Sequence, residues 1–181
     1  MADRPIASVS FEEAIEQSQL LLSQWEQGQL STTEAQAAVS QLLDSANGAR
    51  GFFVAFLTGD SPLADQPPPE FLAALQTAPP AVAELLVKNL AMPTAMALTH
   101  QRNGDTEQQQ DSERVARRTI ALLKQLHPSV VVPLARAMQT SAQTGSGNYA
   151  EFLNRWRYDT EQRQAIATAM AALLPTEQPA S

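Results

Sequence analysis

The 181-residue chain contains no cysteine, only two histidines and no long uninterrupted apolar run. The absence of cysteine excludes thiol catalysis, cysteine-based zinc sites and disulfide bonds. The longest apolar stretches, residues 52–57 and 130–134, are far too short to cross a bilayer, and residues 1–13 lack the apolar segment of a signal peptide. We therefore expect a soluble, cytoplasmic protein with no integral membrane segment.

The chain also lacks the motifs of common catalytic and cofactor-binding sites. It contains no G-x-S-x-G, P-loop or G-x-G-x-x-G sequence. His100 and His127 are 27 residues apart, and neither has a carboxylate or a second histidine four residues away, which argues against a metal site. We expect each histidine near the C-terminal end of a helix, where the helix dipole favours positive charge. The sequence predicts a protein that is not an enzyme, with no catalytic residue, metal or cofactor.

Basic residues are too few for a general nucleic-acid-binding protein, because the net charge is −7. The charge is also uneven. Residues 1–80 carry ten acids and two bases, a net charge of −8, whereas residues 81–181 carry nine acids and ten bases, a net charge of +1. Two interpretations are open: a solvated acidic surface, or a polar molecule that orients toward a charged partner.

What the chain has in abundance is good helix formers, chiefly Ala, Leu, Gln and Glu. Periodic apolar patterns predict an all-α fold, a compact orthogonal or irregular bundle of about eight to ten helices. The expected helices cover about 11–27, 32–46, 50–57, 70–77, 80–92, 95–103, 113–126, 130–141, 149–156 and 160–174. Residues 50–57 could form a helix or a buried strand, and we prefer a helix because no second strand is available to pair with it.

Local signals set several of these boundaries. Three cap pairs predict helix starts: Ser10 with Glu13, Ser31 with Glu34, and, more weakly, Asp159 with Gln162. Asn47-Gly48 is expected to stop the second helix, Pro93 to kink or split a helix, and Ser129 to cap another. The polar residues 104–112 are expected to form an exposed loop or a frayed helix start.

The domain organisation follows from these patterns. We expect an N-terminal arm over 1–9, a single helical domain over 10–174 and a disordered tail over 175–181. The proline-rich connector at 60–69 is a candidate boundary within the domain.

Two groups of arginines are the candidate binding residues. Arg114, Arg117 and Arg118 share one helical face and could hold a phosphate or carboxylate, or could instead pair with Asp111, Glu113 or the acidic N-terminal helices.

The second group is Arg155, Trp156 and Arg157, with Tyr158 and Arg163 nearby. An aromatic ring among arginines could stack on a ligand or a protein partner. Trp156 could equally be a core anchor at a helix junction.

Two segments, 49–60 (ARGFFVAFLTGD) and 88–103 (KNLAMPTAMALTHQRN), resemble stretches of small uncharacterised cyanobacterial all-helical proteins. The resemblance implies a cytoplasmic or thylakoid-adjacent setting, and it assigns no functional residue.

The sequence therefore predicts a non-enzymatic protein–protein interaction or regulatory and assembly module. Its partner is expected to be another protein, and self-association stays open. The alternative is a helical domain that binds a small apolar or anionic ligand. In that case Phe52, Phe53 and Phe56 would line the pocket, with Arg50 or Arg114 holding an anionic head group.

Overall fold

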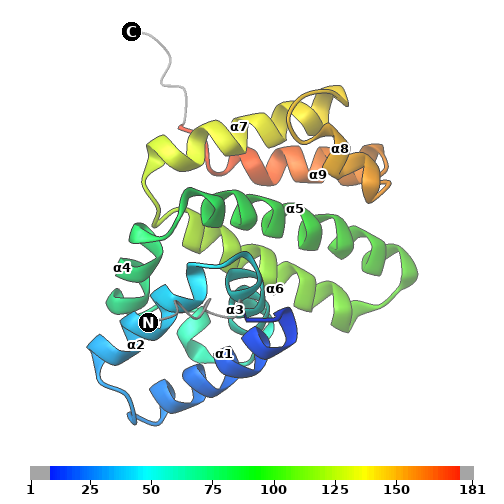
Figure 1. Cartoon of the computed structure of the whole chain (residues 1–181). Coiled ribbons are helices and arrows are strands. Elements are labelled where there is room, and N and C mark those ends of the chain that lie inside the picture. The colour runs from blue at the N-terminus through cyan, green and yellow to red at the C-terminus, as the bar shows by residue number, and fades with distance from the viewer. Residues whose placement is uncertain (1–8, 176–181) are drawn as a thin grey trace, which may run out of the picture. The chain divides into compact units, whose positions relative to one another are not determined.

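The computed structural model describes residues 9–175, and this range folds into helices without a strand (Figure 1). The described chain contains nine α-helices and a short 3-10 helix: α1 (Phe11–Glu26), α2 (Thr32–Leu43), α3 (Ala46–Thr58), η1 (Pro62–Ala64), α4 (Pro69–Thr77), α5 (Pro80–Asn103), α6 (Thr106–Leu123), α7 (Pro128–Thr144), α8 (Ala150–Arg155) and α9 (Thr160–Ala171). The predicted all-α class and the number of helices are confirmed. Residues 50–57 lie within α3, so the preference for a helix over a strand is also confirmed.

The chain divides into two compact units, Met1–Val82 and Ala83–Ser181. The proline-rich connector over 60–69 lies inside the first unit, where it contains η1 and the start of α4. The predicted N-terminal arm and C-terminal tail lie almost wholly outside the described residues. The charge asymmetry follows the division, because no charged residue lies between 80 and 83.

Helix starts in the first unit follow local capping chemistry. The capping boxes at Ser10 and Ser31 are both present, and each cap serine is bonded to the carboxylate of Glu13 or Glu34. These hydrogen bonds lower the pKa of both carboxyl groups from their usual range. The prediction that Asn47-Gly48 stops a helix is wrong. Ser45 caps α3 by accepting from the Gly48 amide at 3.0 Å, so both residues belong to the first turn of the next helix.

The first unit packs α1 against α3, and α2 against α3 and α4. A Cβ placed on Gly51 of α3 would lie 2.5 Å from Ala14 Cβ and 2.8 Å from the Ile15 nitrogen of α1. Only glycine permits so close an approach. The contact lies on the face of α1 that buries Ala14, Ser18, Leu21 and Leu22, while Phe11, Ile15 and Trp25 are partly exposed.

Helix α5 runs unbroken through Pro93, so the predicted split is wrong. Pro93 cannot donate a backbone hydrogen bond, but the helix around it is held by packing, since Leu90, Ala91 and Ala95 are completely buried. The Thr94 hydroxyl also donates to the Leu90 carbonyl at 2.7 Å. Proline therefore removes one bond here without ending the helix.

Within the described residues, α5 alone is long and apolar enough to cross a membrane by length and composition. Its 24 residues include a window with a mean hydropathy of 1.3, of which 39% is buried. Core helices of soluble proteins meet the same criterion, and Leu86 and Leu90 of α5 are completely buried. The absence of an integral membrane segment stays a prediction.

Two boundaries in the second unit differ from expectation. Helix α6 begins at Thr106, not near Glu113, because Asp105 caps it by accepting from the Gln108 amide at 3.1 Å and the polar residues that follow are good helix formers. Helix α7 is capped by His127, whose Nδ1 accepts from the Ser129 amide at 3.3 Å. The predictions of a Ser129 cap and of His127 as a helix C-terminal residue are both wrong.

The second unit packs α7 against α9 and α8 (Figure 1). Large apolar side chains on these helices are completely buried: Met138, Leu153, Ile166 and Met170. Met138 helps to fill this core, as flexible methionine side chains often do, whereas Met96 on α5 is 38% exposed. This packing places the short turn between α8 and α9 at the surface.

Candidate functional site

The phenylalanines proposed as pocket walls fill the core of the first unit. Phe52, Phe53 and Phe56 are all 0% exposed, as is Phe71 from α4. Their ring centroids lie 4.5 to 5.6 Å apart, and Phe56 stacks on Phe71 at 4.5 Å. Arg50 lies at the surface, with its guanidinium 4.9 Å from the centroid of the Phe11 ring. The cluster is therefore a packed aromatic core.

The arginines of α6 do not form one open cationic face. Arg118 is only 5% exposed, whereas Arg117 points to the surface. Arg114 pairs with Asp111 at 3.0 Å, one turn earlier on the same helix. The intrahelical pairing with Asp111 considered from the sequence is therefore present. The three side chains are not presented together to a ligand.

The surface around Trp156 is different. Trp156 follows the last residue of α8 and is 51% exposed, so its alternative role as a core anchor does not apply. Arg155 and Arg157 flank it, and both side chains reach solvent. Arg155 approaches Glu151 at 3.4 Å, in a pair whose side chains are 73% and 90% exposed. The Arg157 side chain has no hydrogen bond or ion pair among residues 9–175. We call Arg155, Trp156 and Arg157 the Trp156 patch.

The backbone beneath the patch makes a tight corner. Arg157 has φ of 53°, in the left-handed region that a side chain disfavours by about 1–2 kcal/mol. Its amide donates to the Asn154 carbonyl at 3.0 Å, which closes the end of α8. Residue 158 then turns inward, and Tyr158 is only 8% exposed. Burial raises the pKa of Tyr158 to about 12.

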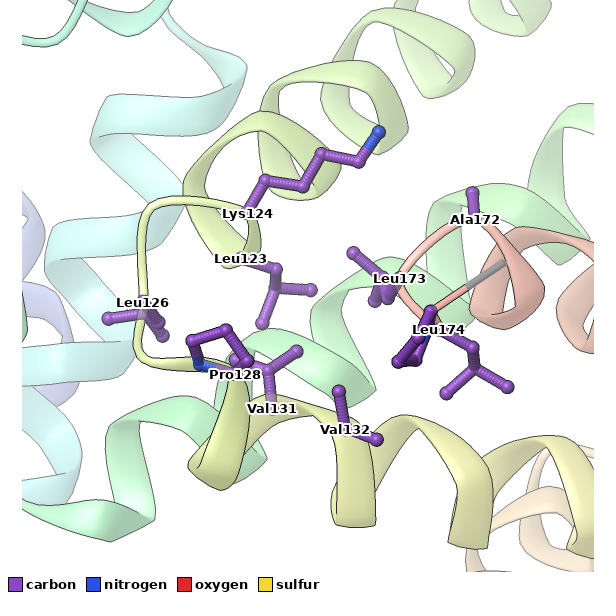
Figure 2. A pocket seen from close by; sticks show the side chains of 10 residues that line it. Leu123, Lys124, Leu126, Pro128, Val131, Val132, Ala172, Leu173 and Leu174 are labelled. Atoms are coloured by element: carbon purple, nitrogen blue, oxygen red, sulfur yellow. The ribbon is translucent and has the colours of Figure 1, made fainter. Parts of the chain in front are cut away.

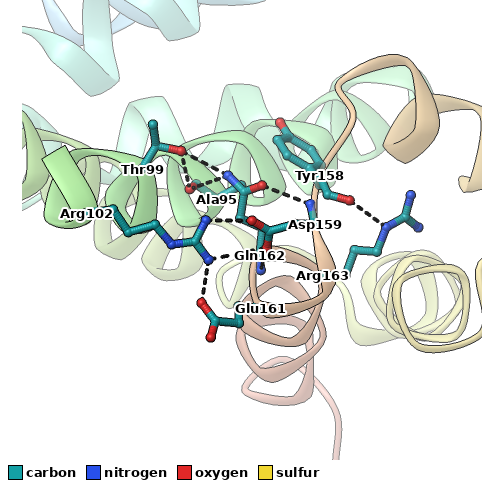
Figure 3. A network of polar contacts seen from close by, with 8 residues as sticks. All are labelled: Ala95, Thr99, Arg102, Tyr158, Asp159, Glu161, Gln162 and Arg163. Carbon is teal, nitrogen blue, oxygen red and sulfur yellow. Dashed lines mark hydrogen bonds and ion pairs between the residues drawn. The ribbon is translucent and has the colours of Figure 1, made fainter.

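Polar side chains hold this corner from both sides (Figure 3). Arg163 on α9 donates from Nε to the Tyr158 carbonyl at 3.0 Å and from Nη2 to Asn154 Oδ1 at 2.9 Å. The capping box of Asp159 and Gln162 is present, which confirms the third predicted cap. The corner is therefore braced by α9 as well as by α8.

Gln162 also ties α9 to α5. Its Nε2 donates to the Ala95 carbonyl at 3.1 Å and to the Thr99 hydroxyl at 3.0 Å, while its Oε1 accepts from the Asp159 amide (Figure 3). Gln162 is 8% exposed, so these bonds lie largely out of water and gain strength.

Arg102 of α5 adds an ion-pair network at the surface. It bonds to Asp159 Oδ2 at 2.6 Å and also to Glu161. The hydrogen bond from Arg102 lowers the pKa of Asp159 from its usual range, and the same contacts raise the pKa of Arg102. The start of α9 is thereby fixed to α5.

The sequence pointed to part of this arrangement. The Asp159–Gln162 cap is local in sequence and was predicted. Arg155, Trp156 and Arg157 were named as candidate binding residues, with a core role for Trp156 left open. The roles of Gln162 and Arg102 in joining α5 to α9 were missed, because a sequence pattern does not tell which distant helix a polar side chain will meet.

A polar hollow of about 290 Å³ lies beside the corner. Asn154, Thr160 and Arg163 line it from the corner, and Gln143 and Thr144 line it from the end of α7. Side-chain amides and hydroxyls of this kind can form hydrogen bonds with polar groups of a bound molecule.

Metal ligation finds no support in the described residues, which contain no group of three or more His, Asp or Glu side chains able to hold an ion. His100 lies in the last turn of α5, as predicted, and His127 caps α7.

The model of one protein family matches residues 10–173, which is most of the chain. That family is described as "Uncharacterised conserved protein UCP020893". The chain belongs to it. No protein in the comparison with curated proteins matches, and no solved structure matches. Family membership therefore supports the existence of a conserved fold over the described helices and leaves the function to the geometry of the chain itself.

Proposed function

We propose that this protein is a non-enzymatic interaction module, regulatory or assembly-directing, that binds another protein through the Trp156 patch. The observation that carries the proposal is a half-exposed tryptophan held between two surface arginines on a braced corner. Tryptophan and arginine are among the residues that most often dominate the energy of protein interfaces.

The chemistry of the patch indicates its partner. Burial of the exposed half of the Trp156 ring favours an apolar surface, and the flanking arginines favour carboxylates around it. Arg157 has no internal ion pair in the described range, and the pair of Arg155 with Glu151 is long and exposed. Both guanidinium groups can therefore turn to an acidic partner at little cost.

Rigidity of the corner favours binding. Arg163, Asp159 and Gln162 fix the backbone on the α9 side of the patch before any partner arrives. A preorganised contact loses less conformational entropy on binding than a mobile loop would. The polar hollow beside the corner offers further hydrogen-bonding groups at the edge of the same surface.

The setting of this partner is also a proposal. The likeness of segments 49–60 and 88–103 to cyanobacterial proteins supports a cytoplasmic or thylakoid-adjacent location. The net charge of −7 argues against nucleic acid as the partner.

The test is recovery of a stoichiometric partner from native extract at physiological salt with the full chain as bait. Trp156→Ala is expected to lose that partner, and the double change of Arg155 and Arg157 to Glu to lose it as well. Leu20→Ala is the matched control, because Leu20 on α1 is a large apolar residue with 59% exposure. It should retain the partner.

Two outcomes contradict the proposal. The first is a partner that binds Trp156→Ala and Leu20→Ala equally well. The second is a bait that recovers no protein but co-purifies with a small molecule. Sedimentation of the purified chain alone separates self-association from binding to a different protein.

A further inference from the structure

A second hollow lies in the same unit, where the end of α6, the start of α7 and the end of α9 meet (Figure 2). Its volume is about 270 Å³. Leu123, Leu126 and Val131 are buried at 1%, 9% and 3% exposure and form its floor. Val132, Leu173 and Leu174 line it and are partly exposed. The hollow is thus apolar inside and open to solvent.

Among the residues that the structure describes, Lys124 is the one charged residue that lines this hollow. Figure 2 shows Leu123 and Leu173 pointing toward a common space, with the extended side chain of Lys124 along its edge. Its aliphatic stem can contact an apolar ligand while the ammonium stays in water. Lys124 caps the end of α6, where the helix dipole favours a cation. The helix dipole alone can account for a lysine at this position. It does not account for the apolar hollow beside the lysine.

Lys124 is available to a ligand. Its side chain has no hydrogen bond or ion pair among residues 9–175. The other lysine of the chain, Lys88, pairs with Glu84 at 2.7 Å and lies 5.8 Å from the centroid of the Tyr149 ring. The two lysines therefore differ in whether their charge is already compensated.

We propose that this hollow, the Lys124 hollow, binds a small aliphatic carboxylate, with the hydrocarbon chain against Leu123, Val131 and Leu173 and the carboxylate on the Lys124 ammonium. The proposal is independent of the Trp156 patch, because none of the patch residues lines the hollow.

The size and charge of the hollow favour an aliphatic carboxylate over a second copy of the chain and over a phosphate. Ten of the described residues line the hollow, fewer than the 20–30 that each partner of a stable protein interface typically contributes, which argues against a second copy of the chain. A single ammonium matches a monoanion, whereas phosphate sites usually gather several donors or a bidentate arginine. The volume of about 270 Å³ lies just below the range typical of ligand sites, roughly 300–1,000 Å³, which favours a short or medium chain.

Calorimetric titration of the full chain with butanoate, hexanoate and octanoate tests the apolar contact. Each added methylene is expected to tighten binding by roughly three- to fourfold until the hollow is filled. Octylammonium, which has the same number of carbons and the opposite charge, should bind at least about tenfold more weakly than octanoate, because it meets Lys124 with like charge.

Variants locate the site. Lys124→Gln should weaken octanoate binding and remove the preference over octylammonium, and Lys124→Arg should keep both. Lys88→Gln is the matched control and should change neither. Ala172→Phe places a large ring at the edge of the hollow and should abolish binding. Because Ala172 is exposed, we expect the circular dichroism spectrum of this variant to match that of the unchanged chain.

The proposal is overturned if octanoate and octylammonium bind equally, or if Lys88→Gln and Lys124→Gln weaken binding to the same extent. It is also overturned if folded Ala172→Phe binds octanoate normally. Self-association that Ala172→Phe abolishes and octanoate does not affect would assign the surface to a second copy of the chain instead.

Discussion

The two units of the molecule organise their side chains differently. The first unit holds five of the six phenylalanines and a net charge of −8, and its largest fully buried side chains form one aromatic cluster. The second unit holds both tyrosines and nearly balanced charge. It contains the braced corner at Trp156, the polar hollow and the Lys124 hollow. Aromatic side chains therefore dominate the core of the first unit, whereas the second unit combines a mostly aliphatic core with polar and cationic groups at its surface.

Truncation of the aromatic cluster is expected to have the largest effect. Phe56→Ala removes a ring that is 0% exposed and stacked on Phe71, and the lost burial plus the cavity should reduce the free energy of unfolding by about 3–5 kcal/mol. Urea unfolding followed by circular dichroism measures it. Val54→Ala on the same helix, where Val54 is 39% exposed, should cost well under half as much. Similar losses in the two variants would contradict a concentrated core.

The close approach of α1 and α3 gives the next largest effect. Gly51→Ala would force its Cβ against Ala14 and the Ile15 backbone, and overpacking of this kind should cost about 1–3 kcal/mol. On an open helical face the same change would stabilise by about 0.5–1 kcal/mol, because glycine is the poorer helix former. The sign of the change in the free energy of unfolding therefore tells whether α1 and α3 are in close contact at Gly51. A stabilised variant would show that they are not.

The polar link in the second unit is expected to have an effect of similar size. Gln162→Leu removes the bonds to the Ala95 carbonyl, the Thr99 hydroxyl and the Asp159 amide, and should cost about 1–3 kcal/mol. Gln164→Leu, two residues along the same helix and exposed, serves as the control and should change the stability by less than about 0.5 kcal/mol. An unfolding midpoint in urea that is the same for both variants would mean that the link between α5 and α9 contributes nothing measurable.

The features of the fold differ in whether the sequence alone predicts them. The caps at Ser10, Ser31 and Asp159 join residues three apart, so the pattern alone identifies them. The close contact at Gly51 and the bonds of Gln162 join distant segments of the chain. A periodic apolar pattern does not say which helix will lie opposite, so neither could be derived.

The errors have a similar cause. Pro93 was expected to kink or split a helix on local grounds, yet the helix is not split, because burial of Leu90, Ala91 and Ala95 maintains it. The polar residues 104–112 suggested an exposed loop or a frayed helix start, but a cap at Asp105 and residues of good helix propensity start α6 there. For Trp156 the sequence left core and surface open, and its exposure at the corner decides in favour of the surface.

The smallest expected effect concerns the Arg102 network. Arg102 lowers the pKa of Asp159, so its contribution to stability is fully present above the ordinary carboxyl pKa of about 3.8 and is lost as the pH falls through the lowered native value. The melting temperature of the unchanged chain should therefore exceed that of Arg102→Gln most at neutral pH, and the difference should shrink below about pH 4. Because these side chains are exposed, the difference should be small and should fall in 1 M salt.

The control for this experiment is Glu161→Gln, which leaves the bond of Arg102 to Asp159 in place. It should lower the melting temperature less than Arg102→Gln does, because the contact with Asp159 is the larger cause of the raised pKa of Arg102. A difference between Arg102→Gln and the unchanged chain that stays constant from pH 7 to pH 3 would show that Arg102 acts through packing of its side chain. The ion pair would then add nothing, and the polar stabilisation of the second unit would rest on Gln162 and Arg163.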